Sequence, residues 1–231
     1  MALISRAFFA RHSLQVAPDL LGCVIEHQTA AGLVAVELTE VEAYAGENDP
    51  ASHAYRGRTA RNAVMFGPPG HAYVYFTYGM HFCANLVCLG NGSASAVLLR
   101  AGRVIEGEEL ARDRRTRGAT MVSFRDLARG PARMCQALDI DRSLDGADVC
   151  VPYSPLRVRG PGASTTLRSA KIAIGPRVGV SSAAEVPWRF WIEGEPTVSA
   201  YRAATPRLRG VPGGLYGFVP PWLAPPKLVT P

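Results

Sequence analysis

The stretch LVAVELTEVEAY, at residues 33–44, decides the fold that we predict for this chain. Apolar side chains alternate with others along its first half, as they do in a β-strand with one buried face. If the strand stays regular, Glu40 and Glu42 emerge on the same face as the apolar side chains up to Leu38. A carboxylate on a buried face is costly unless it has a partner or a task. The stretch therefore predicts a strand at 33–42 whose two glutamates need either a partner or a function.

The rest of the chain supplies further elements, which follow from the spacing of apolar residues and from turn signals. We expect strands at 24–25, 72–76, 81–88, 96–101, 177–180 and 189–193, and helices at 16–21, 106–117 and 131–138. The sequence Thr77-Tyr78-Gly79-Met80 predicts a hairpin turn, since Gly79 can take the positive φ that a tight turn requires. This turn places Tyr78 at an exposed tip. Residues 46–71 and 151–168 are expected to be loops.

The composition is that of one globular domain. The chain has 231 residues, of which 48% are hydrophobic, and this is enough for a proper core. We predict a mixed α/β fold, with a curved and largely antiparallel sheet, peripheral helices and a protruding β-hairpin at 72–88. The domain is expected to span residues 1–204, and a proline-rich tail follows at 205–231.

Charge and cysteine content indicate the partner and the compartment. The net charge of +6 and the pI of about 9.3 suit a polyanionic partner. Lysine occurs only at positions 171 and 227. The preference for arginine suits bidentate phosphate contacts, although a codon bias would produce the same skew. Five scattered cysteines argue against a disulfide framework, and we find neither a signal peptide nor a membrane span. We expect a reduced cytosolic protein, nucleoid-associated if bacterial.

Chemistry is concentrated between Thr39 and Arg100. This region holds two closely spaced carboxylates, five tyrosines, three histidines, and arginines at 56, 58, 61 and 100. Carboxylates activate water, aromatic faces hold flat bases, and arginines bind phosphates. Glu42 is the best candidate base, because it stands at the end of a buried strand, although a structural pair with an arginine explains it equally well. We interpret the cluster as chemistry on a nucleic acid.

Several aromatic side chains in this region could recognise a base. Tyr44, His53 and Tyr75 could hold a flipped-out base between flat faces, although ordinary packing explains any single one of them better. Tyr78 differs, because an exposed aromatic on a turn has no packing role. It predicts a wedge that fills the gap left by a flipped nucleotide, or else a protein–protein contact.

These motifs carry a family resemblance. The string VEAYAGENDPASHAYRGRTARNAVMFGPPGHAYVYFTYGMHFCANLVC at 41–88, followed by VLLRAGRVIEG, resembles the 3-methyladenine (alkyladenine) DNA glycosylases of the mammalian alkylpurine-glycosylase type. Weaker matches extend the likeness to most of the chain: RAFF at 6–9, DLLG at 19–22, GPARMCQALDI at 130–140, RVGV at 177–180 and RFWIEG at 189–194. The stretch 89–95 is slightly longer than that pattern, and the tail departs from it.

The resemblance implies a catalytic role for two residues and a base-holding role for three. Glu42 matches the general base that activates the attacking water, and Arg100 matches the arginine that orients this water and the abasic sugar. Tyr44 matches the residue that stacks on one side of the flipped base. His53 and Tyr75 match those on the other side. The reaction implied is removal of a damaged purine from duplex DNA in base-excision repair.

The resemblance also implies contacts around the pocket. Asn85 matches the asparagine that disfavours guanine by crowding its 2-amino group. Tyr78 matches the intercalating tyrosine, and Met80 lies beside it. Phosphate contacts fall, with a looser match, on Arg56, Arg58 and Arg133. The lesion range stays open: 3-methyladenine alone, or also hypoxanthine, ethenoadenine and 7-methylguanine.

The sequence argues against several other kinds of site. His81 and Cys83 share a strand face, but Cys88 has the opposite parity, so we expect no metal site. The chain contains neither a GxGxxG motif nor a P-loop, so we expect no nucleotide cofactor. Both lysines lie far in sequence from the 39–100 block, which predicts a monofunctional enzyme that leaves the strand uncut. A lesion-binding protein without catalysis and an RNA-modifying enzyme are the alternatives. Damaged double-stranded DNA is the expected partner of a monomeric protein.

Overall fold

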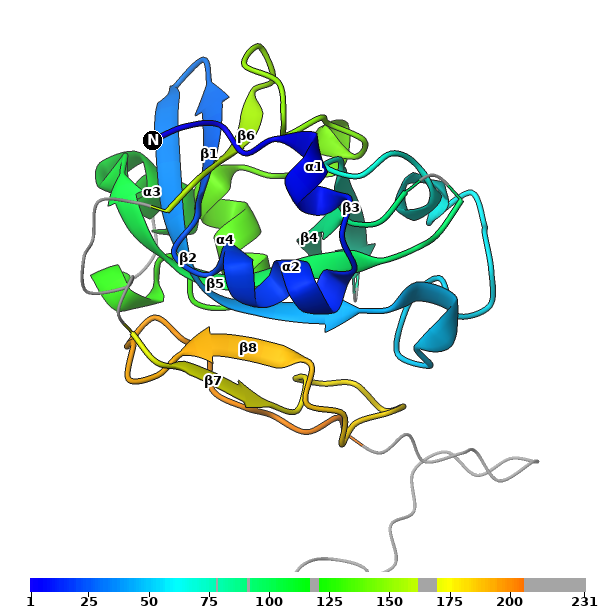
Figure 1. Ribbon diagram of the computed structural model, residues 1–231. Helices are drawn as coiled ribbons and strands as arrows, with labels where there is room; N and C mark the ends of the chain where they lie inside the picture. The colour runs from blue at the N-terminus through cyan, green and yellow to red at the C-terminus, as the bar shows by residue number, and fades with distance from the viewer. Residues whose placement is uncertain (78, 91, 117–120, 162–169, 206–231) are drawn as a thin grey trace, which may run out of the picture.

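The protein folds around one curled antiparallel sheet (Figure 1). The computed structural model describes residues 1–77, 79–90, 92–116, 121–161 and 170–205. Within them, eight strands pair in the order β3–β4–β5–β2–β1–β6, and the β7–β8 pair joins through β8 to β2. The strands are β1 (Val24–Thr29), β2 (Gly32–Tyr44), β3 (Ala72–Thr77), β4 (His81–Val87), β5 (Ala96–Glu106), β6 (Leu156–Arg159), β7 (Ile172–Gly175) and β8 (Arg189–Ile192). The predicted mixed α/β single domain is therefore confirmed.

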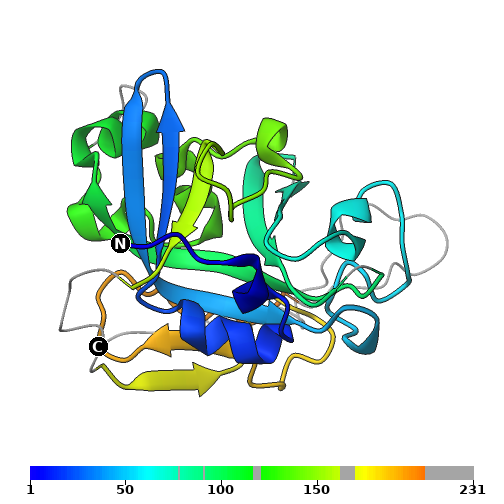
Figure 2. The ribbon, with the colours of Figure 1, turned by 45° about the horizontal axis from the view of Figure 1, so that its top comes forward.

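The strand β2 is the centre of the sheet, and it bends. It pairs with β5 along one edge, while its other edge pairs first with β1 and then, from Glu40 to Glu42, with β8. Figure 2 shows this change of partner along the strand. The pairing with β5 shifts register on both sides of Glu40, and Leu38 and Val41 both join the main core. The expectation of a regular alternation was therefore wrong, because a β-bulge interrupts it.

Helices cover the sheet (Figure 1), and the described part of the chain contains four α-helices. They are α1 (Arg6–Phe9), α2 (Ser13–Leu20), α3 (Glu108–Thr116) and α4 (Pro131–Leu138), and four short 3-10 helices accompany them. The helix α2 packs against β2 and β5, while α4 packs against β4, β5 and α3. Pro131 starts α4, where its missing N–H costs nothing. The helix α4 matches its predicted bounds, and α3 starts two residues later than predicted.

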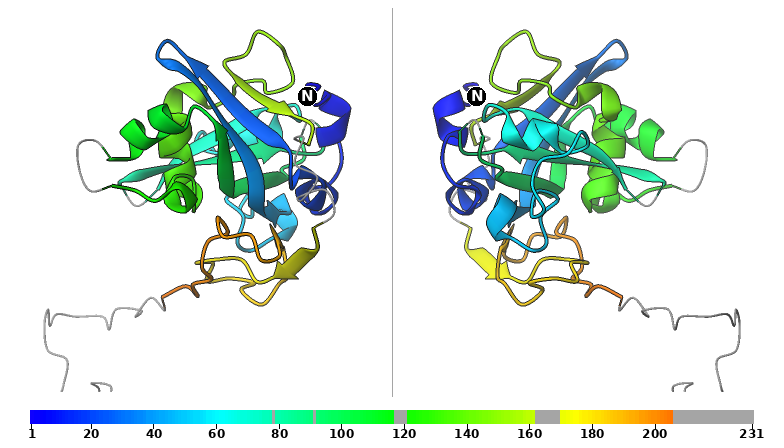
Figure 3. Two further views of the ribbon diagram at one scale, coloured as in Figure 1. Left: turned by 90° about the vertical axis from the view of Figure 1, so that its left-hand side faces the viewer. Right: turned by 90° about the vertical axis from the view of Figure 1, so that its right-hand side faces the viewer.

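The β3–β4 hairpin forms as predicted, next to α4 (Figure 3). Thr77 pairs with His81 across its end, and Gly79 has a φ of 65°. Tyr78 itself lies outside the described residues, as does the tail from 206 onward. Met80 on the turn is 68% exposed.

Two local predictions were wrong. Residues 177–180 were expected to be a strand, but they form a turn, and the strand β7 lies just before them. The alternation in RVGV suggested a strand. Arg177 is instead buried in a loop, where it forms an ion pair with Asp49. The expected loop at 151–168 contains β6, which pairs with β1.

Candidate active site

A pocket of about 590 Å³ opens where β3, β4 and β5 meet the end of β2. The start of α4 and the loop 178–182 complete its wall. Of the residues predicted to act on a base, five line this pocket: Tyr44, His53, Tyr75, Asn85 and Arg100. The structure thus brings together side chains that are up to 56 positions apart in the sequence, from position 44 to position 100.

The β3–β4 hairpin sorts its side chains by parity. Tyr73 and Tyr75 line the pocket, while Val74 between them belongs to the main core. On β4, Cys83 and Asn85 line the pocket in the same way, because successive side chains of a strand point to opposite faces. The shared face predicted for His81 and Cys83 is confirmed, and Asn85 lies on it too.

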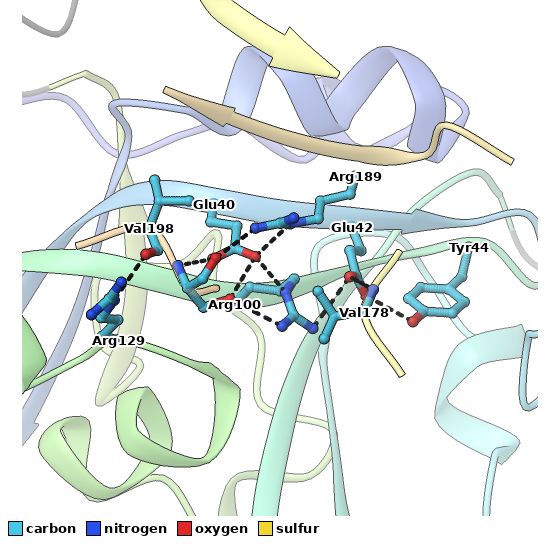
Figure 4. Close-up of polar contacts among 9 residues, drawn as sticks. Glu40, Glu42, Tyr44, Arg100, Arg129, Val178, Arg189 and Val198 are labelled. Atoms are coloured by element: carbon cyan, nitrogen blue, oxygen red, sulfur yellow. Dashed lines mark hydrogen bonds and ion pairs between the residues drawn. The ribbon is translucent and has the colours of Figure 1, made fainter. Parts of the chain in front are cut away.

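Glu42 lies fully buried behind the pocket wall (Figure 4). Its Oε1 accepts from the backbone N–H of Val178 at 2.7 Å and lies 3.2 Å from Nη1 of Arg100. Its Oε2 accepts from the hydroxyl of Tyr44 at 2.9 Å. Burial, together with the charge of Glu42, raises the pKa of Tyr44 well above its ordinary value. Tyr44 therefore stays a neutral donor to the carboxylate.

Glu40, two residues earlier, is buried in a dense set of contacts (Figure 4). It accepts from Nε of Arg100 and from Nε of Arg189, both at 2.7 Å, and from the N–H and hydroxyl of Ser199 at 2.7 and 2.9 Å. Burial works against its charge, but Arg100 and Arg189 outweigh it and lower the pKa of Glu40. Glu40 is thus an ionised anchor for Arg100, and it is less available to water than Glu42.

Arg100 links the two carboxylates. It reaches Glu40 through Nε and Glu42 through Nη1. Burial disfavours its charge, but Glu42 and Glu40 outweigh this and raise the pKa of Arg100. The group is therefore a permanent cation on the pocket wall.

An aromatic wall faces this charged group. The rings of His53 and Tyr75 meet edge to face at 4.5 Å, and those of Tyr73 and Tyr75 stack at 5.5 Å. Nδ1 of His53 lies 3.1 Å from the Tyr73 hydroxyl. Partial burial and the charge of Arg61 lower the pKa of His53, while burial raises the pKa of Tyr75 well above its ordinary value. Both rings are thus held neutral, as flat surfaces for a base.

Comparison with known proteins agrees with this arrangement. The model of the methylpurine-DNA glycosylase family matches residues 7–196. The chain belongs to the methylpurine-DNA glycosylase family. It is therefore an enzyme, a monofunctional DNA glycosylase, as the sequence resemblance implied.

Three relatives illustrate how closely this glycosylase matches other members. A protein of Streptomyces avermitilis is 57% identical over 208 residues, which cover 89% of this chain and 95% of the relative. One of Leifsonia xyli subsp. xyli is 51% identical, covering 87% and 94%, and one of Methanocella arvoryzae is 46% identical, covering 86% and 96%. Each carries the name "Putative 3-methyladenine DNA glycosylase".

Sequence reasoning missed one pair that supports the glycosylase pocket. Arg177 is buried and binds both carboxylate oxygens of Asp49, at 2.5 and 2.9 Å. Its guanidinium lies 4.6 Å from the centroid of the Tyr44 ring, and it donates to the carbonyl of Ala43 at 3.1 Å. Arg177 thus braces Tyr44 on the strand end that carries Glu42. The sequence held no signal for a pair 128 positions apart.

The predicted DNA contacts lie outside the pocket of the glycosylase. Arg56 and Arg58 are exposed, and no carboxylate of the described residues forms an ion pair with either of them. Arg133 is exposed and lies 3.4 Å from Asp126. Met80 borders a smaller hollow of about 290 Å³.

No group of three or more His, Cys, Asp or Glu side chains in the described part of the chain could hold a metal ion. No helix in the same part of the chain is long and apolar enough to cross a membrane.

Proposed function

We propose that this glycosylase flips alkylated or deaminated purines out of duplex DNA and hydrolyses the N-glycosidic bond with a water activated by Glu42. The substrates proposed are 3-methyladenine, hypoxanthine, ethenoadenine and 7-methylguanine. One observation carries the proposal: the carboxylate of Glu42 is held by Tyr44 and Arg100, which both line the aromatic pocket. The enzyme would act as a monomer in base-excision repair.

The pocket suits a damaged purine. Tyr44 would stack on one face of the flipped base, and His53 with Tyr75 would lie on the other. Alkylation at N3 or N7 makes a purine cationic, and the faces of tyrosine rings attract cations. The same positive charge makes the base a better leaving group, so the pocket would hold the bases that leave most readily.

Glu42 can act as the base from its buried position. Each carboxylate oxygen has two lone pairs, and among the described residues Oε2 accepts only from Tyr44. The second lone pair of Oε2 would accept a proton from water as that water attacks the sugar carbon. Positive charge builds on the sugar as the bond to the base breaks, and a carboxylate nearby stabilises it. The product would be an intact strand with an abasic site.

Base release tests this function directly. Duplexes that each contain one defined lesion would be incubated with the purified chain, and free base and strand cleavage would be measured separately. We expect free base with an uncut strand, and activity that persists in EDTA. Binding to lesion DNA without base release would instead favour a lesion-binding protein, and activity on RNA duplexes would favour an RNA-modifying enzyme.

Asn85 is proposed to disfavour bases that carry a 2-amino group, so that 7-methylguanine is excised more slowly than hypoxanthine. Its amide donates to the carbonyl of Tyr73 at 3.2 Å, which fixes the side chain in the pocket wall. Replacing Asn85 with Ser should raise the ratio of 7-methylguanine to hypoxanthine excision by about tenfold, the lower end of what one pocket contact discriminates. The ratio of the two rates is insensitive to any loss of folded enzyme. An unchanged ratio would remove Asn85 from the selective part of the pocket.

Arg56 and Arg58, together with Arg133, are proposed to bind phosphates, while Tyr78 and Met80 fill the gap in the duplex. Replacing both Arg56 and Arg58 with Ala should lower the slope of log affinity against log salt by about 1.8, because each phosphate contact contributes about 0.9. Replacing both Arg157 and Arg159 with Ala is the matched control, since both are paired with Glu26 near the opposite edge of the sheet. An equal change in slope for the control would show that only net charge matters.

A further inference from the structure

Arg100 uses each of its three nitrogens differently. Nε donates to Glu40 at 2.7 Å, Nη1 lies 3.2 Å from Glu42, and Nη2 donates to the hydroxyl of Ser199 at 3.2 Å. A guanidinium carries five N–H groups. Two of them are donated in hydrogen bonds within the described residues, one to Glu40 and one to Ser199, and Nη1 also forms an ion pair with Glu42. The remaining N–H groups on the two terminal nitrogens are available to the pocket that Arg100 lines.

Of its two side-chain partners, Glu40 and Arg100, the Ser199 hydroxyl can donate its proton only to Glu40. An ionised carboxylate can only accept, so the hydroxyl donates to Oε1 of Glu40 at 2.9 Å. Its oxygen is then left to accept from Nη2 of Arg100. Ser199 thus bridges the far end of the guanidinium to the same carboxylate that holds its near end.

The backbone around Ser199 is itself fixed. Its N–H donates to Oε2 of Glu40 and its carbonyl accepts from Arg189, both at 2.7 Å. The carbonyl of Val198 accepts from Nε of Arg129 at 2.9 Å (Figure 4). The hydroxyl is therefore presented by a rigid segment, and it can fix another group.

We propose that Ser199 is a positioning residue that aims the remaining terminal N–H groups of Arg100 at the water and sugar. This inference rests on the proposed function. With Nη2 released, Glu40 and Glu42 would be the only polar side chains among the described residues that restrain the guanidinium, and both hold it from the β2 side. The family model ends at residue 196, so Ser199 lies beyond the part of the chain that this match covers.

The variant Ser199→Ala tests this proposal, because the Glu40 contact to the backbone N–H of residue 199 survives the substitution. The single-turnover rate of base release should fall about tenfold, the effect of losing one hydrogen bond to a charged group. Affinity for lesion DNA and the melting temperature should stay near wild type. Ser199→Thr, which keeps the hydroxyl, should restore the rate. Ser143→Ala is the matched control, since it also removes a serine hydroxyl donated to a carboxylate, that of Asp141.

A double-mutant cycle separates positioning from general weakening. Lys at position 100 keeps the charge but has no planar fork to align, so Ser199→Ala should have almost no further effect on the rate of an Arg100→Lys enzyme. The same tenfold loss in both backgrounds would overturn the proposal, as would a wild-type rate for Ser199→Ala. If the unsubstituted chain releases no base at all, it is the proposed function that fails.

Discussion

Glu42→Gln is expected to lower the rate of base release by at least about a hundredfold, the usual effect of losing a general base. Glutamine keeps the shape of the side chain and can still contact Tyr44, Val178 and Arg100, but it cannot accept a proton from water. Binding to lesion DNA should survive, because recognition of the base depends on the aromatic faces. Single-turnover excision and equilibrium binding on the same duplex would measure both quantities.

A neighbouring carboxylate provides the control for this substitution. Glu37 lies on the same strand and is buried as well. Its carboxylate pairs with Arg103 at an N–O distance of 2.7 Å, and neither residue lines the pocket. Glu37→Gln should leave the excision rate per folded molecule unchanged. A wild-type rate for Glu42→Gln would move the role to Glu40, although the contacts of Glu40 with Arg100, Arg189 and Ser199 leave it little room to bind water.

Asp49→Asn should give the largest loss of stability. The substitution removes one charge of a pair in which both side chains are fully buried, and Arg177 is left as an uncompensated cation. Breaking a buried pair in this way costs about 3–5 kcal/mol. Each kcal/mol lowers the melting temperature of a domain of this size by roughly 2–4 °C. Thermal and urea unfolding would measure the loss.

An exposed ion pair provides the comparison for the buried Asp49–Arg177 pair. Lys171 and Glu193 lie 3.1 Å apart with side chains that are 80% and 53% exposed. Glu193→Gln should therefore cost less than about 1 kcal/mol. Equal losses for the two variants would mean that solvent screens the Asp49–Arg177 pair as well. A stable Asp49→Asn enzyme with slow excision would show that the pair acts on Tyr44 alone.

The order of neighbouring residues in the sequence predicted the strands and the turn that depend on local interactions. The alternation along 72–76 and 81–88 assigned His81 and Cys83 to one face, and the turn at Gly79 followed from its φ preference. The bulge in β2 was not visible, because it depends on how β5 and β8 pair with Glu40. The contacts of Arg177 and Ser199 join segments more than 100 residues apart, and no local pattern encodes them.

The division of the β3–β4 hairpin between two faces has a consequence for how this enzyme can change. On β4 the pocket-lining side chains of Cys83 and Asn85 alternate with Ala84 and Leu86 of the main core. A substitution at Asn85 or Cys83 is therefore expected to change the shape of the pocket, while Ala84 and Leu86 keep the strand in place. A single substitution on the pocket face of β4 could therefore change which damaged base is recognised while the core-facing side chains of the strand stay the same. A directed library confined to positions 83 and 85, which belong to neither core cluster, should retain a high proportion of folded members.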